Sequence, residues 1–416
     1  MKIIVWGINY APEVVGIAPC NAAVCEFLER RGHEVRMITT FCYYPAWCKL
    51  PADEDLLYRT DILNGVPIHR CWHYVPRKVT SLRRVFHEAS FVVTAFLRLM
   101  ALPRPDVLVV VSPPLLLGVF AWFASVIKRC PYVFHVQDLQ PDAAVGLKMV
   151  QSGLLLRGLY ALETIAYRRA ARVSGISQGM LQAFRRKHVA EHKILYFPNS
   201  ISLTYDLDYP QEPGAFRRQH ALSKDDFLVV YSGNLGVKQG LTLLLDCAAH
   251  LRDETIKLVL CGDGAMREAL ARQIKDRNLS QILLLPLQPE AKYVAMLRDA
   301  NLCVITQQPG TGYAFFPSKL LPTLALGKPV LAVADGKSEL FRVTQSGRFG
   351  ITLATLDAAT IAQTIMQLAK SPESLAGMAQ AGCDYVRQFD RKTVLTAFEQ
   401  ELRSLCRFPE TLKKNV

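Results

Sequence analysis

The segment YSGNLGVKQGL at residues 231–241 carries the most informative arrangement of side chains in the sequence. An apolar run that predicts a strand ends there in a turn with Gly233, Asn234 and Lys238. A helix is expected to begin near Gln239. Backbone N–H groups at such a turn and at a helix N-terminus favour an anion, and the lysine adds positive charge. The alternative is a structural turn that carries an exposed lysine.

A second segment, FPSKLLPTLALGKPV at residues 316–330, predicts another helix N-terminus with positive charge. A proline in the first turn is followed by Ser318 and Lys319, and Gly327 fits the end of the helix. Pro322 requires either a place in the first turn of this helix or a kink. A capped helix with an exposed lysine is the alternative.

Two lysine-bearing turns suit a reaction in which a nucleoside diphosphate departs, because the developing negative charge must be neutralised. A third turn, CGDG, follows a predicted strand at residues 257–261 and includes Gly262 and Gly264. Glycines there let a ligand approach the backbone. Together the three segments predict a site for a nucleotide diphosphate sugar in the second half of the chain.

In the first half, the segment YVFHVQDLQPD at residues 132–142 predicts a strand that ends in polar groups. Ligands of open parallel sheets bind beyond the carboxyl ends of the strands. Asp138 is therefore a candidate for contacting or deprotonating an acceptor hydroxyl, because a carboxylate can orient an alcohol and take its proton. Alternatively, Asp138 or Asp142 caps the helix that follows.

The segment HRCWH places His69, Cys71 and His73 on one face of a predicted strand. Imidazole and thiolate groups are zinc ligands, but no fourth ligand is evident. Ordinary alternating packing on a strand explains the spacing as well. We expect no metal site and no bound cofactor.

Apolar strand-like runs alternate with helical patterns in the first half, which indicates a doubly wound parallel sheet. The predicted strands are residues 2–7, 34–39, 66–71, 107–111, 132–136 and 172–175, with helices such as 21–31 and 155–171 between them.

The alternation pauses at residues 200–214 and restarts with strands at 227–231, 257–261, 281–285, 302–306 and 330–333. The sequence therefore predicts an α/β fold with two Rossmann-like domains. The N-terminal domain, expected to bind the acceptor, spans residues 1–203, and the domain expected to bind the nucleotide sugar spans 204–390. A last helical segment, 391–416, is expected to pack back towards the N-terminal domain.

The chain of 416 residues has a formal net charge of +13, which suits an anionic partner. Its basic residues are scattered in pairs, with no long block that is interleaved with aromatics. We therefore favour a phosphorylated substrate or an anionic membrane surface over nucleic acid. Eleven cysteines without a CxxC pair indicate reduced thiols in a cytoplasmic protein.

Two apolar stretches are candidates for contact with a membrane. Residues 107–127 carry no charge and are long enough to span a bilayer. A Ser-Pro-Pro sequence divides them, however, into a predicted strand at 107–111 and a helix at 115–127. Residues 81–102 mix arginines with apolar residues and predict either a helix on a membrane surface or an ordinary packed helix.

Taken together, these segments resemble glycosyltransferase family 4, whose members have the GT-B fold. The matching features are the opening GINYAPE with a glycine after it, the linker FPNSI at residues 197–201, and the three C-terminal segments, in the same order and spacing. Within the family the sequence is most similar to bacterial exopolysaccharide enzymes of the colanic-acid type. They share GINYxPE, the tyrosine-rich segment at residues 43–45 and the Gln137-Asp138 pair.

The resemblance implies two Rossmann-like domains facing a central cleft, a retaining reaction and no metal. It implies that Lys238 contacts the donor diphosphate and that Ser318 and Lys319 lie at a phosphate-binding helix start. The full set of residues assigned to the donor in this way is Gly16, Gly233, Asn234, Lys238, Gly262, Gly264, Ser318 and Lys319.

Two departures from the family pattern concern the donor. Asn234 stands where many members have arginine. Ala314 and Pro322 stand where many members carry two glutamates that touch the sugar and the ribose. Those contacts are therefore expected from elsewhere, such as the loop at residues 310–316.

The sequence thus predicts a peripheral enzyme on the inner face of the cytoplasmic membrane. It would move a hexose from a nucleotide diphosphate sugar to a lipid-linked oligosaccharide in exopolysaccharide synthesis, and the resemblance suggests fucose or galactose. Two alternatives stay open: a GT-B nucleotide-sugar epimerase, and a non-catalytic relative that binds a nucleotide sugar.

Overall fold

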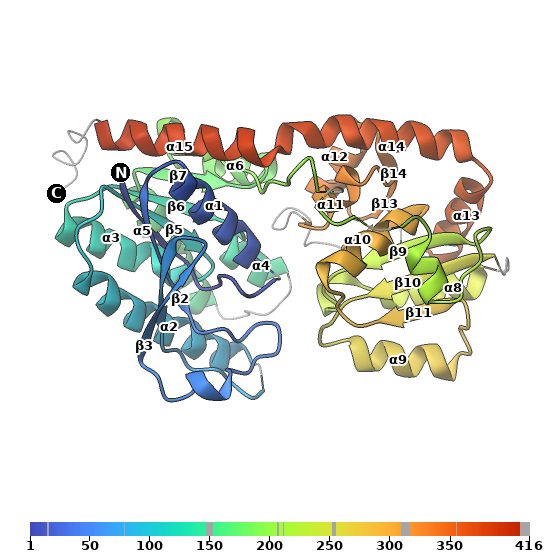
Figure 1. Cartoon of the computed structure of the whole chain (residues 1–416), viewed down its shortest axis with the longest axis horizontal. Coiled ribbons are helices and arrows are strands. Elements are labelled where there is room, and N and C mark those ends of the chain that lie inside the picture. Colours follow the sequence, from blue (N-terminus) through green and yellow to red (C-terminus); the bar gives the residue numbers. More distant parts are fainter. Residues whose placement is uncertain are drawn as a thin grey trace. The chain divides into compact units, whose positions relative to one another are not determined.

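The computed structural model describes residues 1–407 apart from 15, 79, 147–152, 206–207, 211, 252–254, 309–316 and 355. The chain divides into two compact units (Figure 1). Unit 1 comprises Met1–Asn199 with Thr393–Val416, and unit 2 comprises Ser200–Lys392. These divisions lie a few residues from the expected ones.

The sheet of unit 1 has the strand order β3-β4-β2-β1-β5-β6-β7-β8, and among its described strands only β3 and β4 pair antiparallel. The strands are β1 Lys2–Trp6, β2 Glu34–Thr40, β3 Tyr58–Leu63, β4 Val66–Cys71, β5 Val107–Ser112, β6 Tyr132–Val136, β7 Arg172–Gly175 and β8 Ile194–Tyr196. The central strands are continuous buried runs, as parallel sheets require. The sequence pattern misses β3 and β8 because β3 is an edge strand without a buried face and β8 has three residues.

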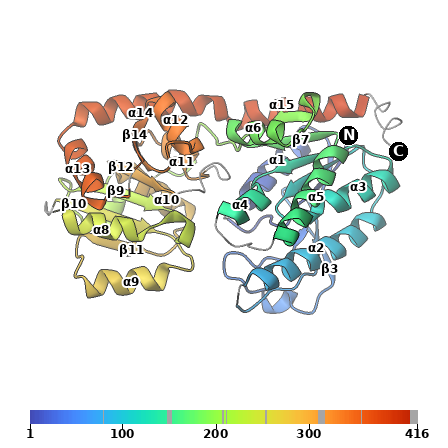
Figure 2. The same ribbon diagram turned by 180° about the vertical axis from the view of Figure 1, so that it is seen from behind.

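Helices cover both faces of this sheet. They are α1 Ala18–Arg30, α2 Ser81–Ala101, α3 Leu116–Lys128, α4 Gln140–Gly146, α5 Gly153–Arg169, α6 Gln178–Arg186 and α15 Arg391–Arg407. The helices α1 and α15 share one apolar core with the sheet. On the other face α3 packs between α2 and α5, and the three lie side by side in Figure 2.

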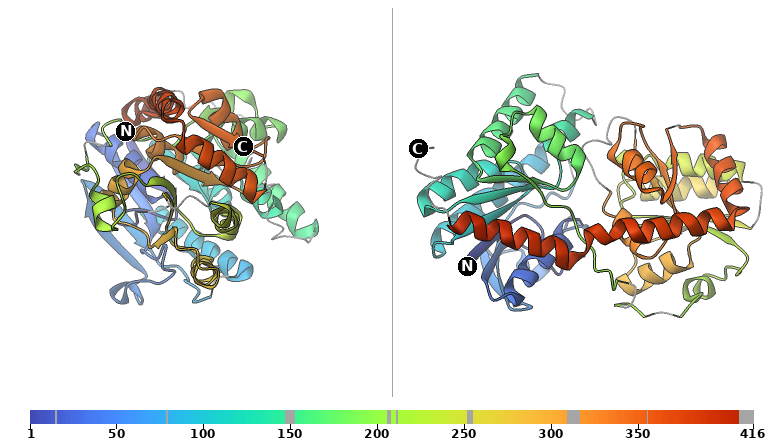
Figure 3. Two further views of the ribbon diagram at one scale, coloured as in Figure 1. Left: turned by 90° about the vertical axis from the view of Figure 1, so that its right-hand side faces the viewer. Right: turned by 90° about the horizontal axis from the view of Figure 1, so that it is seen from above.

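The final helix α15 runs along unit 1 as the red helix of Figure 3. An aromatic stack and a buried carboxylate hold it there. The rings of Phe398 and Phe197 stack with centroids 3.9 Å apart. The Glu399 carboxylate accepts hydrogen bonds from Arg31 at 3.1 Å and from Arg403 at 2.7 Å, and lies 2.9 Å from the His33 ring. This residue ties α15 to the end of α1.

The sheet of unit 2 is wholly parallel, with the order β11-β10-β9-β12-β13-β14. Its strands are β9 Phe227–Ser232, β10 Ile256–Cys261, β11 Ile282–Leu285, β12 Leu302–Thr306, β13 Val330–Val333 and β14 Gly350–Leu353. The half-buried edge strand β14 is not predicted from the sequence. The strand order reverses between β9 and β12, which is where ligands of such sheets bind.

The helices of unit 2 also form two layers. They are α7 Ala215–Gln219, α8 Thr242–His250, α9 Arg267–Asp276, α10 Glu290–Asp299, α11 Leu320–Ala325, α12 Glu339–Gly347, α13 Ala358–Ala369 and α14 Pro372–Val386. Side chains of α8, α9 and α13 pack in one core, and those of α10, α11 and α12 pack in the core of the opposite face. The carboxyl ends of β9, β10 and β12 lie at one edge between these layers.

Candidate active site

The glycine turns that follow β9 and β10 lie side by side at this edge of unit 2. The N–H of Gly233 donates to the carbonyl of Cys261 at 2.8 Å, and the N–H of Leu235 donates to that of Asp263 at 2.8 Å. A Cβ on Gly262 would lie 1.8 Å from the Gly233 oxygen, so the two backbones are in direct contact. The packing of the two turns therefore requires glycine at position 262, whatever ligand binds there.

The side chain of Lys319 lies over the first of these turns. Its Nζ is 3.9 Å from the ring centroid of Tyr231, and a Cβ on Gly233 would come within 2.8 Å of it. The nitrogen is buried and has no hydrogen-bond partner among the described residues. Burial lowers the pKa of this amine to about 7. A buried ammonium without an anion is costly, so this position favours a negatively charged ligand.

The start of α11 positions this lysine. The helix begins at Leu320 with Lys319 as its N-cap residue, so Pro322 lies in the first turn, as its presence requires. Pro317 precedes the helix instead of opening it, because its carbonyl accepts from the N–H of Leu320 in a turn. Gly327 follows the helix end with φ 61°.

Lys238 lies in the short 3-10 turn Val237–Gln239 that follows the Gly233 turn. Its carbonyl accepts from the N–H of Gln308 at 2.9 Å, which ties this turn to the end of β12. The helix that the sequence predicts near Gln239 begins three residues later, at Thr242. Gly240 takes φ 64° and interrupts the backbone, and α8 begins at Thr242.

The remaining donor residues of the sequence analysis lie in the same turns. Gly264 follows β10, and a Cβ on it would lie 2.4 Å from Oδ1 of Asn234. Asn234 and Ser318 are exposed. The structure therefore brings the three glycine- and lysine-bearing segments of unit 2 together. Ala314 and the loop 310–316 lie outside the described residues.

A pocket of about 200 Å³ opens at the ends of β12 and β13, beside the start of α8. Gln239, Thr242, Thr306 and Gln307 are among its lining residues. The Oε1 atoms of Gln239 and Gln307 are buried and accept no hydrogen bond from the described part of the chain. Sequence reasoning assigns no ligand role to these two glutamines, although Gln239 lies within the segment 231–241 and Gln307 directly follows the strand predicted at 302–306.

In unit 1, Asp138 lies directly after β6, where the sequence places it. The preceding Gln137 forms a paired amide contact with Asn199, at 2.9 and 3.1 Å, and donates to Nε2 of His135 at 2.9 Å. Burial lowers the pKa of His135 to about 3, so the ring is neutral and its Nδ1–H faces Ser174 Oγ at 2.9 Å. This buried network fixes the backbone that carries Asp138.

Asp138 also lies within electrostatic reach of Arg84. Burial lowers the pKa of the Arg84 guanidinium, but Glu88, Tyr43 and Asp138 outweigh this effect, so the pKa is raised. Asp142 serves a different purpose, because it forms an ion pair with Lys187. Of the two aspartates in the segment, only Asp138 remains a candidate for chemistry.

A buried glutamate organises the loop after β2. The carboxylate of Glu13 accepts the backbone N–H groups of Tyr43 and Tyr44, both at 2.9 Å, and the side-chain amide of Asn9 at 2.8 Å. The motifs GINYAPE and Tyr43-Tyr44 are thus two parts of one local structure. Gly16 is exposed with φ 68°, and a Cβ on it would lie 3.8 Å from the Tyr44 ring.

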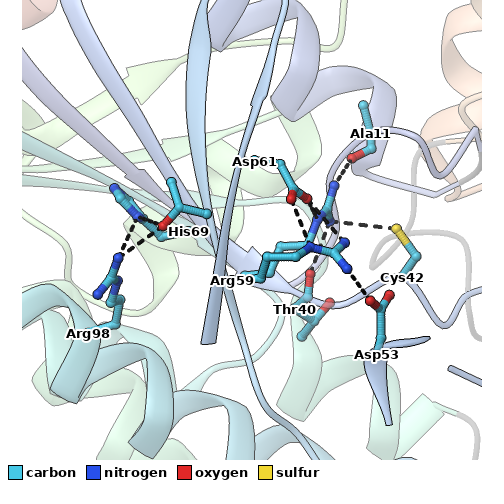
Figure 4. Close-up of polar contacts among 10 residues, drawn as sticks. Ala11, Thr40, Cys42, Asp53, Arg59, Asp61, His69 and Arg98 are labelled. Carbon is cyan, nitrogen blue, oxygen red and sulfur yellow. Dashed lines mark hydrogen bonds and ion pairs between the residues drawn. The ribbon is translucent and has the colours of Figure 1, made fainter. Parts of the chain in front are cut away.

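In the segment HRCWH, the side chain of His69 forms hydrogen bonds within unit 1. His69 Nδ1 lies 3.0 Å from Thr60 Oγ1 and 3.2 Å from a guanidinium nitrogen of Arg98 (Figure 4). Burial and the Arg98 cation lower the pKa of His69 to about 4. Among the described residues no group of His, Cys, Asp and Glu is arranged to hold a metal ion. The independence from metal that we expect stays a prediction.

Arg70 of the same segment links two loops at the carboxyl edge of the unit 1 sheet. Its guanidinium donates to the carbonyl of Ala11 at 2.8 Å, to that of Thr40 at 3.3 Å, and to Asp61 at 2.6 Å. A second arginine, Arg59, shares the Asp61 carboxylate at 2.8 Å. The cluster fixes the loop that leads to Glu13.

The apolar stretch at 107–127 folds as the strand β5 and most of the helix α3, as the Ser-Pro-Pro sequence predicts. In the described part of the chain, no helix combines the length and the apolar character needed to cross a bilayer.

Comparisons with known proteins agree on one family. Residues 15–200 match the model of a glycosyl transferase 4-like domain, and residues 214–384 match that of glycosyl transferases group 1. The chain is 31% identical over 352 residues to the putative colanic acid biosynthesis glycosyl transferase WcaI of Escherichia coli K12, covering 83% of this chain and 86% of that protein.

Solved structures share the fold at low sequence identity. Sucrose-phosphate synthase from Thermosynechococcus elongatus has a TM-score of 0.76 at 18% identity, covering 97% of this chain and 98% of its own. The Anabaena protein HepE in complex with UDP-glucose has a TM-score of 0.71 at 18% identity, covering 97% and 100%. The chain therefore belongs to glycosyltransferase family 4: it has the GT-B fold and is a glycosyltransferase.

Proposed function

We propose that this glycosyltransferase moves a hexose, with retention of configuration, from a nucleotide diphosphate sugar to a lipid-linked oligosaccharide in exopolysaccharide synthesis. The similarity to a colanic acid enzyme supports the exopolysaccharide. The similarity to a protein crystallised with UDP-glucose supports a nucleotide sugar as donor. Fucose and galactose remain the sugars that the sequence resemblance suggests.

The observation that carries the proposal is the buried amine of Lys319. It lies at the point where the strand order reverses, over a glycine turn, and no described residue neutralises it. A diphosphate at this turn would supply the missing negative charge and would stabilise the charged form of the lysine. Lys238 would contribute a second positive charge, and Gly16, Gly233, Asn234, Gly262, Gly264 and Ser318 would line the donor.

The hydroxyl groups of the donor sugar need acceptors, and this sequence lacks the usual pair of glutamates. We assign that role to the amide oxygens of Gln239 and Gln307, which are buried in the pocket wall without a partner among the described residues. Each amide oxygen would gain a hydrogen bond only when a sugar hydroxyl binds beside it. The site would therefore discriminate against nucleotide sugars that lack that hydroxyl.

Asp138 is proposed to contact or deprotonate the acceptor hydroxyl from unit 1. Neither a metal nor a bound cofactor takes part, because the lysines would neutralise the departing diphosphate. The basic surplus of the chain supports a peripheral location on the anionic inner face of the cytoplasmic membrane, where a lipid-linked acceptor resides.

A thermal-shift screen of nucleotides tests the donor, because a ligand that binds only the folded state raises the melting temperature. UDP or GDP should raise it, whereas the matching monophosphates should do so less. No shift with any nucleoside diphosphate would contradict the proposal, and a non-catalytic scaffold would then be favoured. Conversion of UDP-N-acetylglucosamine without any acceptor would instead identify an epimerase.

A further inference from the structure

Most of the exposed large apolar side chains in the described part of unit 1 lie on three neighbouring helices. They are Leu82, Val85, Phe86, Val93 and Leu97 on α2, Phe123, Val126 and Ile127 on α3, and Leu154, Leu155 and Ile165 on α5. The others, Val14, Leu50, Leu56, Leu57, Ile62, Tyr74, Val145 and Tyr196, lie elsewhere in the unit. We call this surface the α2–α3–α5 face. Within the described part of unit 2, the exposed large hydrophobic residues are only Leu203, Val237, Leu287 and Leu356, which lie in separate loops and turns.

The stripes on α2 and α3 are continuous with each other. On α2 the exposed residues recur at helical spacing along one side, from Leu82 through Phe86 and Val93 to Leu97. The ring of Phe96, between the last two, packs edge-on against Phe120 of α3 with centroids 5.4 Å apart. The two stripes therefore form one surface.

The third helix joins the same surface at its other border. Arg169 of α5 lies over the ring of Trp122 on α3, 4.6 Å from its centroid, and Ile165 lies one helical turn before that arginine. The exposure is large for aromatic and aliphatic side chains: 59% for Phe86 and 61% for Ile127. Monomeric soluble proteins rarely leave such contiguous patches exposed, so this face has the character of an interaction surface.

The charges around the patch identify its occupant. Besides Arg84, which pairs with Glu88, the exposed basic residues of the three helices and their ends are Arg83, Arg129, Arg157, Arg168 and Arg169. The two acidic residues of these helices are both neutralised, since Glu88 pairs with Arg84 and the buried Glu163 pairs with Lys187. The face thus combines apolar side chains with an unbalanced positive rim. A second copy that docked through the same face would bring these arginines against one another.

We propose that the α2–α3–α5 face docks on an anionic lipid surface, with its apolar side chains inserted at the headgroup boundary and its arginines on the headgroup phosphates. This inference rests on the proposed function, in which the acceptor is carried by a lipid. The helix α2 packs on unit 1 through Phe91, Val92 and Leu99, and on this proposal its opposite side also serves as the membrane-surface helix that residues 81–102 allow.

Co-sedimentation of the full chain with vesicles tests the inference. The wild-type chain should bind vesicles of phosphatidylcholine with phosphatidylglycerol, bind pure phosphatidylcholine more weakly, and lose affinity as salt rises. The triple variant Phe86→Ser, Leu97→Ser, Ile127→Ser should lose about tenfold or more of the affinity, because three apolar anchors are removed. The single variant Ile62→Ser, exposed on β3 in the same unit, should bind as the wild type does.

A second variant, Arg83→Gln with Arg157→Gln, keeps the apolar side chains and should weaken binding to the anionic vesicles alone. Calorimetric titration with UDP and GDP separates this inference from the proposed function, since nucleotide binding should survive in all variants. Wild-type chain that binds nucleotide but no anionic vesicle would overturn the docking surface and leave the transferase intact. A wild-type dimer that the triple variant converts to a monomer would overturn it as well, by assigning the face to a second copy.

Discussion

The turn at Gly233 joins residues that lie far apart in the sequence. Lys319 comes from the start of α11, Tyr231 from the end of β9, and Gly262 from the end of β10. The lysine is costly where it is, because its amine is desolvated and has only an aromatic ring beneath it in the described structure. A buried amine of this kind is expected in a binding site, where an anionic ligand supplies the negative charge that the free protein lacks.

Substitution of this lysine should therefore have opposite effects on binding and on stability. In Lys319→Met, affinity for UDP or GDP should fall about tenfold to a hundredfold through loss of a charge-assisted contact. The melting temperature without nucleotide should rise, because a pKa of about 7 against the ordinary 10.5 means that burial penalises the charged form below pH 10.5.

Calorimetry and thermal unfolding at pH 7 check both parts. Lys275→Met, on the exposed side of α9, is the control and should change neither quantity. A lower melting temperature together with unchanged nucleotide affinity would assign Lys319 to the fold and not to the donor.

Asp138 should act in transfer and not in donor binding. In Asp138→Asn, the transfer rate should fall about a hundredfold or more, which is the usual contribution of a general base, while UDP and GDP bind as before. Initial rates with saturating donor, paired with calorimetry, check this. Asp142→Asn is the comparison, since it removes an ion pair with Lys187 and should lower stability more than turnover. Near-normal turnover of Asp138→Asn would exclude it as the base.

The sequence predicts the residue types of the donor turns but not their packing. Glycine and lysine after an apolar run signal a turn with positive charge. The burial of Lys319 depends on the register of β9 beside β10 and on where α11 begins, and neither is a local property. Glycine is also required at position 262 because a side chain there would clash with the backbone of a neighbouring turn. The sequence alone cannot reveal this contact.

At the scale of elements, continuous apolar runs identify most strands of both sheets, because central parallel strands are buried on both faces. The edge strands β3 and β14 lack that signal and are missed. The sequence predicts the first residue of a helix less accurately. The left-handed backbone of Gly240 interrupts the chain, so α8 begins at Thr242 and not near Gln239. Buried polar contacts such as the Gln137–Asn199 pair join distant segments and leave no periodic trace.

The docking of α15 gives a prediction about pH. Burial raises the pKa of Glu399, but hydrogen bonds from His33, Arg403 and Arg31 outweigh this effect. The pKa is lowered from 4.5 to about 2. The charged carboxylate therefore stabilises the fold above pH 4.5, and this contribution is lost as the pH falls towards 2.

In Glu399→Gln the free energy of unfolding at pH 7 should fall by about 1–3 kcal/mol, the value of charged hydrogen bonds. Denaturant unfolding at several pH values checks this, and the difference from wild type should shrink below pH 4.5. Glu401→Gln, half-exposed on the same helix with a longer ion pair to Arg172, should cost much less. A difference that stayed constant down to pH 2 would contradict the proposed role of the charge.

At the scale of the whole molecule, two doubly wound units and the matches to known glycosyltransferases agree on the GT-B fold. The family resemblance of the sequence predicts this, since its motifs fall on both units. In the proposed function, two lysines in the donor segments of unit 2 would take the role that a metal ion has in other transferases.

Transfer should therefore survive removal of divalent cations. In the presence of EDTA, the rate of sugar transfer by the full chain should remain within about twofold of the untreated enzyme, because no step assigns charge neutralisation to a metal. Addition of Mg²⁺ or Mn²⁺ after chelation should change it no further. A rate that collapsed with EDTA and recovered with a divalent cation would overturn this feature of the mechanism.

The most direct measurement is a crystal structure of the full chain with UDP or GDP. We predict that the diphosphate lies over the Gly233 turn, with its oxygens within hydrogen-bond distance of the Nζ atoms of both Lys319 and Lys238. A structure in which Lys319 stays packed on the Tyr231 ring while the nucleotide binds at another edge of the sheet would contradict this site.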